Sequence, residues 1–332
     1  MVQGGSAARG SGMAGEDADD TLSARGEFAV IDRLTAGRRL PPFVTLGPGD
    51  DAAVVLAPDG RVVVCTDMLV ENRHFRLDWS SPHDVGRKAI AQNAADIEAM
   101  GGRSTAFVVA FGAPGDTDTA SAVELADGMW HEAGLMGAGI VGGDVVAAPQ
   151  WVVSVAALGD LGGRDPVRRD GAKPGDMVAV VGELGRSQAG FTLWDSGISG
   201  HDALRRRHLV PEPPYGQGEI AARGGATAMT DVSDGLLADL GHIASASEVS
   251  IDLAIGHLQP DIDALAEAAA AVGADARQWV LGGGEDHALV ATFASQPPPG
   301  WRVIGTVGAS DGTTAVTVDG ARWRGSAGWQ SF

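Results

Sequence analysis

The stretch "TDVSDG", residues 230–235, decides how the rest of the chain is interpreted. The apolar lead "GGATAM" runs into it and the periodic segment "LLADLGHIA" follows, which predicts a strand giving way to a helix. Asp231 and Asp234 stand at this junction. Helix capping would explain one carboxylate, although Ser233 alone could serve as the cap. An EF-hand calcium loop is excluded, because the glycine comes at the fifth position and His242 occupies the twelfth.

Length, charge and cysteine content limit the class of protein. A chain of 332 residues suggests two domains. The net charge of −19 argues against nucleic acid as a partner, and the sequence has no apolar run long enough for a membrane span and no signal-peptide core. The only cysteine, Cys65, excludes an internal disulfide framework and a cysteine zinc site, and we expect a cytoplasmic protein.

Helical and strand-like segments alternate along the chain, which predicts an α/β (α+β) fold. The segment 82–100 reads as a long amphipathic helix and 186–196 as a shorter one. The segment "GDLGGRDPVRRDGAKPGD", residues 159–176, is rich in Gly, Pro and charge, and predicts a domain boundary. The expected organisation is a disordered tail over 1–25, a first domain over 26–160 and a second domain over 161–332. Strands are expected over 61–66, 105–112, 151–159, 249–255, 287–294, 301–307 and 313–318.

Acidic residues recur at the ends of these predicted strands. Asp67, Asp144 and Asp231 each follow an apolar run, and Asn93 and Asp96 stand three apart on one helix face. A Gly-Pro turn places two more acids, Asp50 and Asp51, just before another apolar run. Any one of these acids could be a turn residue, a cap or part of a solvated face.

Together the acids favour a metal site. If the strand ends converge, several carboxylates meet and repel one another, and divalent cations would relieve the repulsion. Hard oxygen ligands without a His–Cys pattern point to Mg²⁺, which shares its coordination shell with substrate phosphates. The sequence therefore suggests ATP-dependent phosphoryl transfer. The P-loop, the dinucleotide-binding glycine pattern and the protein-kinase motifs are all missing.

Seven motifs carry a resemblance that covers about residues 27–332: "GPGDDAAVV", "TDMLVENRHF", "GRKAIAQNAADIEAMGG", "VGGD", "RRDGAKPGD", "TDVSDGLLADLGHI" and "GGGEDHAL". In these motifs the chain resembles the thiamine-monophosphate kinase family, of the superfamily that includes aminoimidazole ribonucleotide synthetase. The resemblance implies a two-domain fold of mixed sheets packed with helices. It also implies that ATP and thiamine monophosphate give ADP and thiamine diphosphate, the last step of thiamine diphosphate biosynthesis, by direct in-line transfer with no covalent enzyme nucleophile.

The resemblance also implies roles for individual residues. The first domain would bind ATP and several Mg²⁺ ions and form a homodimer, and the second would complete the nucleotide and substrate site. The implied metal ligands are Asp51, Thr66, Asp67, Asp96, Asp144, Asp231 and Asp234. The implied nucleotide contacts are Gly143, Asp144, Arg169 and Ser233, and the implied contacts to thiamine monophosphate are His74, Glu285 and Trp329.

The sequence departs from the family pattern in places. Cys65 stands where Ser or Thr is usual, and His287 and Ala288 stand where Tyr and Glu are usual. Three alternatives remain: another ATP-dependent synthetase of the superfamily, a non-catalytic nucleotide-binding protein, and a serine hydrolase. The last rests on "GRSQA", residues 185–189, which is one residue away from a nucleophile-elbow motif.

Overall fold

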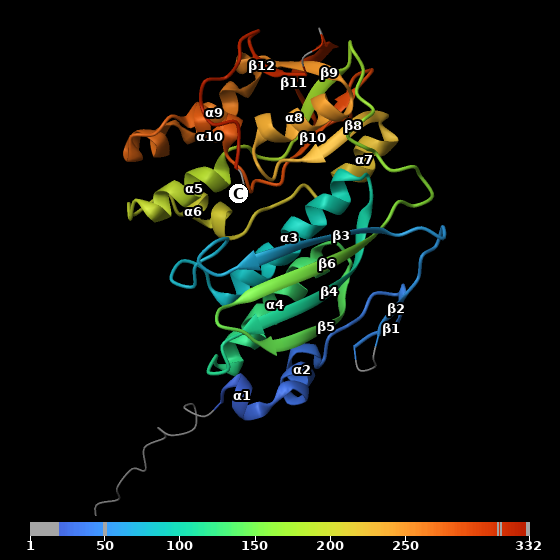
Figure 1. Ribbon diagram of the computed structural model, residues 1–332, viewed down its shortest axis with the longest axis vertical. Coiled ribbons are helices and arrows are strands. Elements are labelled where there is room, and N and C mark those ends of the chain that lie inside the picture. Colours follow the sequence, from blue (N-terminus) through green and yellow to red (C-terminus); the bar gives the residue numbers. More distant parts are fainter. Residues whose placement is uncertain (1–19, 49–51, 311, 313, 330–332) are drawn as a thin grey trace, which may run out of the picture.

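The computed structural model describes residues 20–48, 52–310, 312 and 314–329. Two sheets, each with its own helices, lie one above the other in Figure 1. The first sheet ends with Asp160 and the second begins with Met177, and an extended linker joins them. No helix in the described part of the chain is long and apolar enough to cross a membrane.

The first sheet has four strands in the order β3-β6-β4-β5, with β4 and β5 parallel and the other pairs antiparallel. Its α3 and α4 pack against each other and cover one face of the sheet. The elements of this half are α1 (Leu22–Arg25), α2 (Glu27–Thr35), β1 (Val44–Leu46), β2 (Val54–Val55), β3 (Val63–Val70), α3 (Pro82–Ala99), β4 (Arg103–Ala113), α4 (Thr119–Leu135), β5 (Gly139–Ala147) and β6 (Val152–Asp160).

The other face of this sheet is open and apolar. Side chains alternate along a strand, so residues of one parity share a face. On the face away from α3 and α4, Val64, Met68, Val108 and Val146 are exposed. An apolar patch of this kind marks an interaction surface more often than a solvated one.

The second sheet has six strands in the order β12-β9-β11-β7-β10-β8. Helices α5, α8, α9 and α10 pack around a core that includes the apolar side chains of β7 and β9. The elements are β7 (Met177–Val181), α5 (Arg186–Asp195), α6 (Asp202–Leu209), α7 (Gln217–Arg223), β8 (Ala226–Asp231), α8 (Leu236–Ala246), β9 (Val249–Leu253), α9 (Ile255–Val272), α10 (Ala276–Gly282), β10 (Leu289–Phe293), β11 (Arg302–Ala309) and β12 (Val316–Val318).

Helix α3 is buried nearly all round, which differs from the amphipathic helix predicted over 82–100. Its apolar side, including Val85 and Ile90, packs into the core of the first half. Its polar side, including Lys88 and Glu98, is covered by the second half instead of by water. The period of apolar residues identified the helix, but the covering partner lies more than a hundred residues further along the chain.

The predicted disordered tail also needs correction at its end. Residues 1–19 lie outside the described residues, but Leu22–Arg25 form α1, capped by the Thr21 side chain. Leu22 is buried in the core of the first half, and Arg25 pairs with Asp20. The apolar side chain is what holds this short helix, because a four-residue helix has little stability of its own.

Glu98 is expected to hold α3 against α7. The backbone N–H groups of Gly216 and Gly218 each donate to its buried carboxylate at 2.8 Å. In Glu98→Ala both donors lose their partner, so the free energy of unfolding should fall by about 1–3 kcal/mol. Urea unfolding measures this, with Glu124→Ala, an exposed glutamate of α4, as the control. Equal effects of the two substitutions would contradict the contact's role.

Candidate active site

Two turns of the second half form the floor of the candidate site. Asp231 ends β8 opposite Leu289, the first residue of β10, so the turns that adjoin these ends lie together. The backbone N–H of Glu285 donates to the Ser233 carbonyl at 2.8 Å, and that of His287 donates to the Val232 carbonyl at 2.9 Å. We call residues 231–235 the acidic turn and residues 283–287 the GEDH turn.

Close approach of the two turns requires glycine in the GEDH turn. A Cβ atom at Gly284 would lie 2.5 Å from the Ser233 carbonyl oxygen, which real side chains do not tolerate. Glu285 and His287 adopt positive φ angles of 63° and 53°, which are uncommon for residues other than glycine. A residue keeps such a strained backbone conformation only where surrounding contacts hold it in place, and residues of this kind cluster at functional sites.

Neither Asp231 nor Asp234 caps α8. One Asp239 carboxylate oxygen accepts from the backbone N–H groups of Asp234, at 3.1 Å, and Gly235, at 3.0 Å. Helix α8 begins at Leu236, and the N–H groups that precede it are bound by Asp239, a residue of the helix itself. The capping explanation for the two acids fails, and both carboxylates are available for another task.

Three carboxylates from separate elements meet above the acidic turn. Asp67 comes from β3, Asp96 from α3 and Asp231 from the end of β8. The negative charges of Asp231 and Asp67 both act on Asp96, so the three side chains lie within range of one another's charge. Asn93, one turn before Asp96 on α3, accepts from the Asp67 backbone N–H at 2.9 Å and so fixes β3 against the helix.

Burial and repulsion keep a proton on this cluster. Burial, followed by the charges of Asp231 and Asp67, raises the pKa of Asp96 to about 7. Burial likewise raises the pKa of Asp67, and burial together with the charge of Asp231 raises the pKa of Asp239 to about 7. A divalent cation bound by such carboxylates would offset the repulsion and burial that raise their pKa values.

A buried imidazole, that of His287, pairs with one carboxylate of the cluster. His287 Nδ1 lies 3.0 Å from an Asp231 carboxylate oxygen, and the ring is 5% exposed. Burial alone would lower the pKa of His287, but the hydrogen bond to Asp231 and its charge raise it. Sequence reasoning noted His287 only as a departure from the family pattern, because its partner depends on how the two turns pack.

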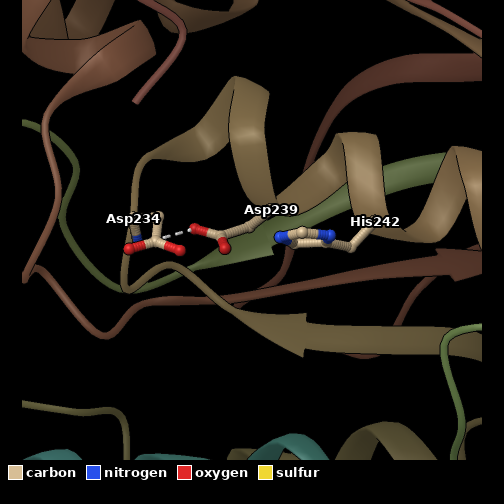
Figure 2. Close-up of side chains that lie close together, drawn as sticks. All are labelled: Asp234, Asp239 and His242. Atoms are coloured by element: carbon tan, nitrogen blue, oxygen red, sulfur yellow. Dashed lines mark hydrogen bonds between the residues drawn. The ribbon is translucent and has the colours of Figure 1, made fainter. Parts of the chain in front are cut away.

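The donor set fits Mg²⁺. Asp67, Asp96 and Asp231 offer hard oxygen ligands, and the thiol of Cys65 is engaged with the Asn93 carbonyl, 3.4 Å away. Among the described residues, ligand atoms of a second group, Asp234, Asp239 and His242, lie within 4.8 Å of one another. Figure 2 shows Asp239 between the other two, on the α8 side of the acidic turn. Asp234 is half-buried, and its charge acts on Asp67 of the cluster.

The predicted substrate contacts His74 and Glu285 lie on facing sides of the junction between the halves. His74 Nδ1 accepts from the Val70 backbone N–H at 3.0 Å, so in the neutral ring Nε2 carries the hydrogen and can donate to a phosphate. Burial lowers the pKa of His74, which favours that neutral form. Glu285 is half-buried beside Lys88, whose charge, against the effect of burial, lowers the pKa of Glu285 to about 2.

Trp329 lies between the two sides. Its backbone N–H donates to the Asp234 carbonyl at 2.9 Å, and the Arg73 guanidinium carbon is 5.7 Å from its ring centroid. The indole is 60% exposed, which leaves an aromatic face free beside the loop that carries His74. The predicted substrate contact is therefore next to the acidic turn.

Other predicted residues do not join the cluster within one chain. Thr66 and Asp144 lie on the open face of the first sheet, and the Thr66 hydroxyl donates to the Val155 carbonyl at 2.8 Å. Gly143 is required by packing, because a Cβ atom there would lie 2.0 Å from the Val109 carbonyl oxygen. Arg169 is exposed on the linker, with its carbonyl bound by Ser247. Asp51 lies outside the described residues.

The serine hydrolase alternative fails on geometry. Ser187 is buried in the first turn of α5, and its hydroxyl lies 3.2 Å from His208 Nδ1. Glu285 approaches the same nitrogen, at 3.5 Å, whereas a triad uses one ring nitrogen for the serine and the other for the acid. The start of α5 is occupied as well, since Asp286 accepts from the Gly185 and Ser187 N–H groups.

Comparison with known proteins identifies the family of this chain. The N-terminal domain of AIR synthase related proteins matches residues 49–161, and the C-terminal domain matches residues 173–318. A thiamine-monophosphate kinase from Mycobacterium tuberculosis is 67% identical over 312 residues, which cover 94% of this chain and 93% of that protein. The chain belongs to the thiamine-monophosphate kinase family. The Corynebacterium glutamicum member is 42% identical over 94% of this chain and 95% of its own length.

Solved structures of the family share the fold. The thiamine-monophosphate kinase from Stenotrophomonas maltophilia K279a superposes with a TM-score of 0.76, at 31% identity, over 89% of this chain and 95% of its own. AaThiL, complexed with AMPPCP and TMP, gives a TM-score of 0.75 at 29% identity over 94% and 98% of the two chains. The two-domain fold of mixed sheets and helices is thereby confirmed.

The raised pKa values predict how pH acts on the metal-free protein. Between about pH 4 and about pH 7 the folded state holds protons on Asp96 and Asp239 that the unfolded state has released. The free energy of unfolding should therefore fall as pH rises through this range. Asp96→Asn should be more stable than the wild type at pH 8 without metal and equal to it near pH 4. Thermal unfolding in EDTA measures both, with the exposed Asp116→Asn as control. A destabilised Asp96→Asn protein at pH 8 would contradict the cluster.

Proposed function

We propose that the chain transfers the γ-phosphoryl group of ATP to thiamine monophosphate, giving ADP and thiamine diphosphate. One observation carries the proposal: Asp67, Asp96 and Asp231, from three elements in two halves of the chain, converge beside the turn that carries Glu285. Family membership supports the same activity, since the curated relatives named above are thiamine-monophosphate kinases.

Mg²⁺ bound by these carboxylates would supply charge neutralisation for the transferring phosphoryl group. Asp67, Asp96 and Asp231 would hold the ions, with Asp234 at the edge of the acidic turn. The phosphate of thiamine monophosphate is already anionic, so in-line attack needs no strong general base and no covalent enzyme intermediate. His74 would donate from Nε2 to that phosphate, and Glu285 would face the cationic thiamine ring system.

The open sheet face supports a homodimer. Val64, Met68, Val108 and Val146 are exposed on it, and association through this face would bury them. Asp144 lies on the same face, away from the cluster of its own chain. We therefore expect Gly143 and Asp144 to act at the nucleotide site of the dimer, together with Ser233 of the acidic turn and Arg169 of the linker.

The proposed location is the cytoplasm, on the ground that the single cysteine suits a reducing compartment. The product, thiamine diphosphate, makes this reaction the last step of its biosynthesis. A synthetase of the superfamily with another substrate is the competing function, and the substrate assay below separates the two.

Substrate choice and metal dependence can be tested in one assay. Purified protein with ATP, Mg²⁺ and thiamine monophosphate should form thiamine diphosphate, while free thiamine should not react because it offers no phosphate to the metal site. Chelator should abolish the activity. Asp67→Asn and Asp231→Asn should each lower kcat at least ~100-fold, since a lost ligand removes several kcal/mol of charge stabilisation. Full activity in either variant, or efficient turnover of thiamine, would overturn the proposal.

A further inference from the structure

Lys88 is a buried charge at the junction of the two halves that the proposed mechanism does not use. It lies on α3, two turns before Asp96, and its side chain is 2% exposed. Its ammonium group lies 3.0 Å from a Glu285 carboxylate oxygen, Oε1. It also donates to the carbonyl of His74 at 3.0 Å and to the carbonyl of His208 at 3.2 Å.

These three contacts use every hydrogen of the ammonium group. Lys88 therefore has no donor left for a substrate phosphate, and it cannot be a phosphate ligand while these contacts last. Two of its three partners are the residues proposed to contact thiamine monophosphate, and they come from opposite sides of the junction. A single buried charge thus connects both proposed substrate contacts.

The contact with Lys88 also decides which part of Glu285 is available. Oε1 is held by Lys88, whereas Oε2 has His208 Nδ1 as its neighbour at 3.5 Å, beyond ordinary hydrogen-bond length. Burial lowers the pKa of His208 to about 4, so the ring is neutral and adds no positive charge on that side. The Glu285 side chain is 37% exposed, so part of it is accessible to a cationic ligand.

The backbone makes this arrangement dependent on Lys88. Glu285 has a φ angle of 63°, a conformation that a non-glycine residue keeps only where other contacts hold it. The backbone of His287 is hydrogen-bonded to the acidic turn, and the Asp286 side chain is hydrogen-bonded to the start of α5. In the GEDH turn, it is the Glu285 side chain that contacts the first half, through Lys88. Without the ammonium group, a half-buried carboxylate would lose its partner and reorient toward water.

We propose that Lys88 is a positioning residue that holds the Glu285 carboxylate and the His74 loop in register across the junction, and so sets recognition of the cationic substrate and not of ATP. The proposal rests on the proposed function for the identity of that substrate. It assigns to Lys88 no contact with substrate and no proton transfer.

Lys88→Met tests the proposal, because methionine keeps most of the side-chain volume and removes the charge. We expect the KM for thiamine monophosphate to rise about 10- to 100-fold, with the KM for ATP changed less than about twofold. Equilibrium binding of thiamine monophosphate, measured calorimetrically without ATP, should weaken in parallel. The matched control is Lys173→Met, the exposed lysine of the linker, which should leave both constants unchanged.

A double-mutant cycle separates positioning from general damage. If Lys88 acts through Glu285, Lys88→Met combined with Glu285→Gln should bind thiamine monophosphate no more weakly than the worse single variant. Additive losses, or equal losses toward ATP, would overturn the proposal. If Lys88→Met does not fold, Lys88→Gln replaces it in the same cycle. A wild-type protein that is inactive with thiamine monophosphate would instead refute the proposed function, and an active wild type with an unchanged KM in the folded variant would refute only the role of Lys88.

Discussion

Repulsion among buried carboxylates is the constraint on which the rest of this structure depends. Asp67 and Asp96 are half-buried and Asp231 is buried, and burial together with the neighbouring charges keeps a proton on Asp96 up to about pH 7. An arrangement of this kind costs stability in the metal-free state and becomes favourable when a cation binds. His287 supplies part of the missing positive charge, and the strained GEDH turn is what places its ring against Asp231.

Helix α3 makes this convergence possible. Its apolar side packs on the first sheet, while its polar side meets the second half through Lys88, Asp96 and Glu98. Each of these three residues makes a different contact at the same junction: Glu98 binds the start of α7, Asp96 joins the carboxylate cluster and Lys88 pairs with Glu285. The position of the candidate active site between two sheets therefore follows from a helix that is buried on both sides.

The sequence predicts many of the helices and strands and several residues of the candidate site. It does not predict contacts between residues that lie far apart in the chain. Acids that follow apolar runs were recognisable, and the structure brings Asp67 and Asp231 together with Asp96. The prediction that these acids end strands is right only for Asp231, because Asp67 lies inside β3 and Asp144 inside β5. Asp144 follows the same rule but falls on the open face of β5, since strand order and parity depend on pairing that no local pattern reveals. Lys88 escaped notice as a site residue because Glu285 and His208 lie on the other half, and His287 because its partner Asp231 lies 56 residues earlier in the chain. The short helices α6, α7 and α10 were also missed, and each is held by packing more than by its own sequence.

The central claim is that these carboxylates bind the metal ions that assist phosphoryl transfer. Locating the metal tests this claim most directly. Crystals grown with Mn²⁺, a non-hydrolysable ATP analogue and thiamine monophosphate would show Mn²⁺ by its anomalous scattering. The account predicts a peak within coordination distance, about 2.0–2.3 Å, of carboxylate oxygens of Asp67, Asp96 and Asp231. Saturating Mn²⁺ with both substrates bound, but with no peak between these three side chains, would contradict it.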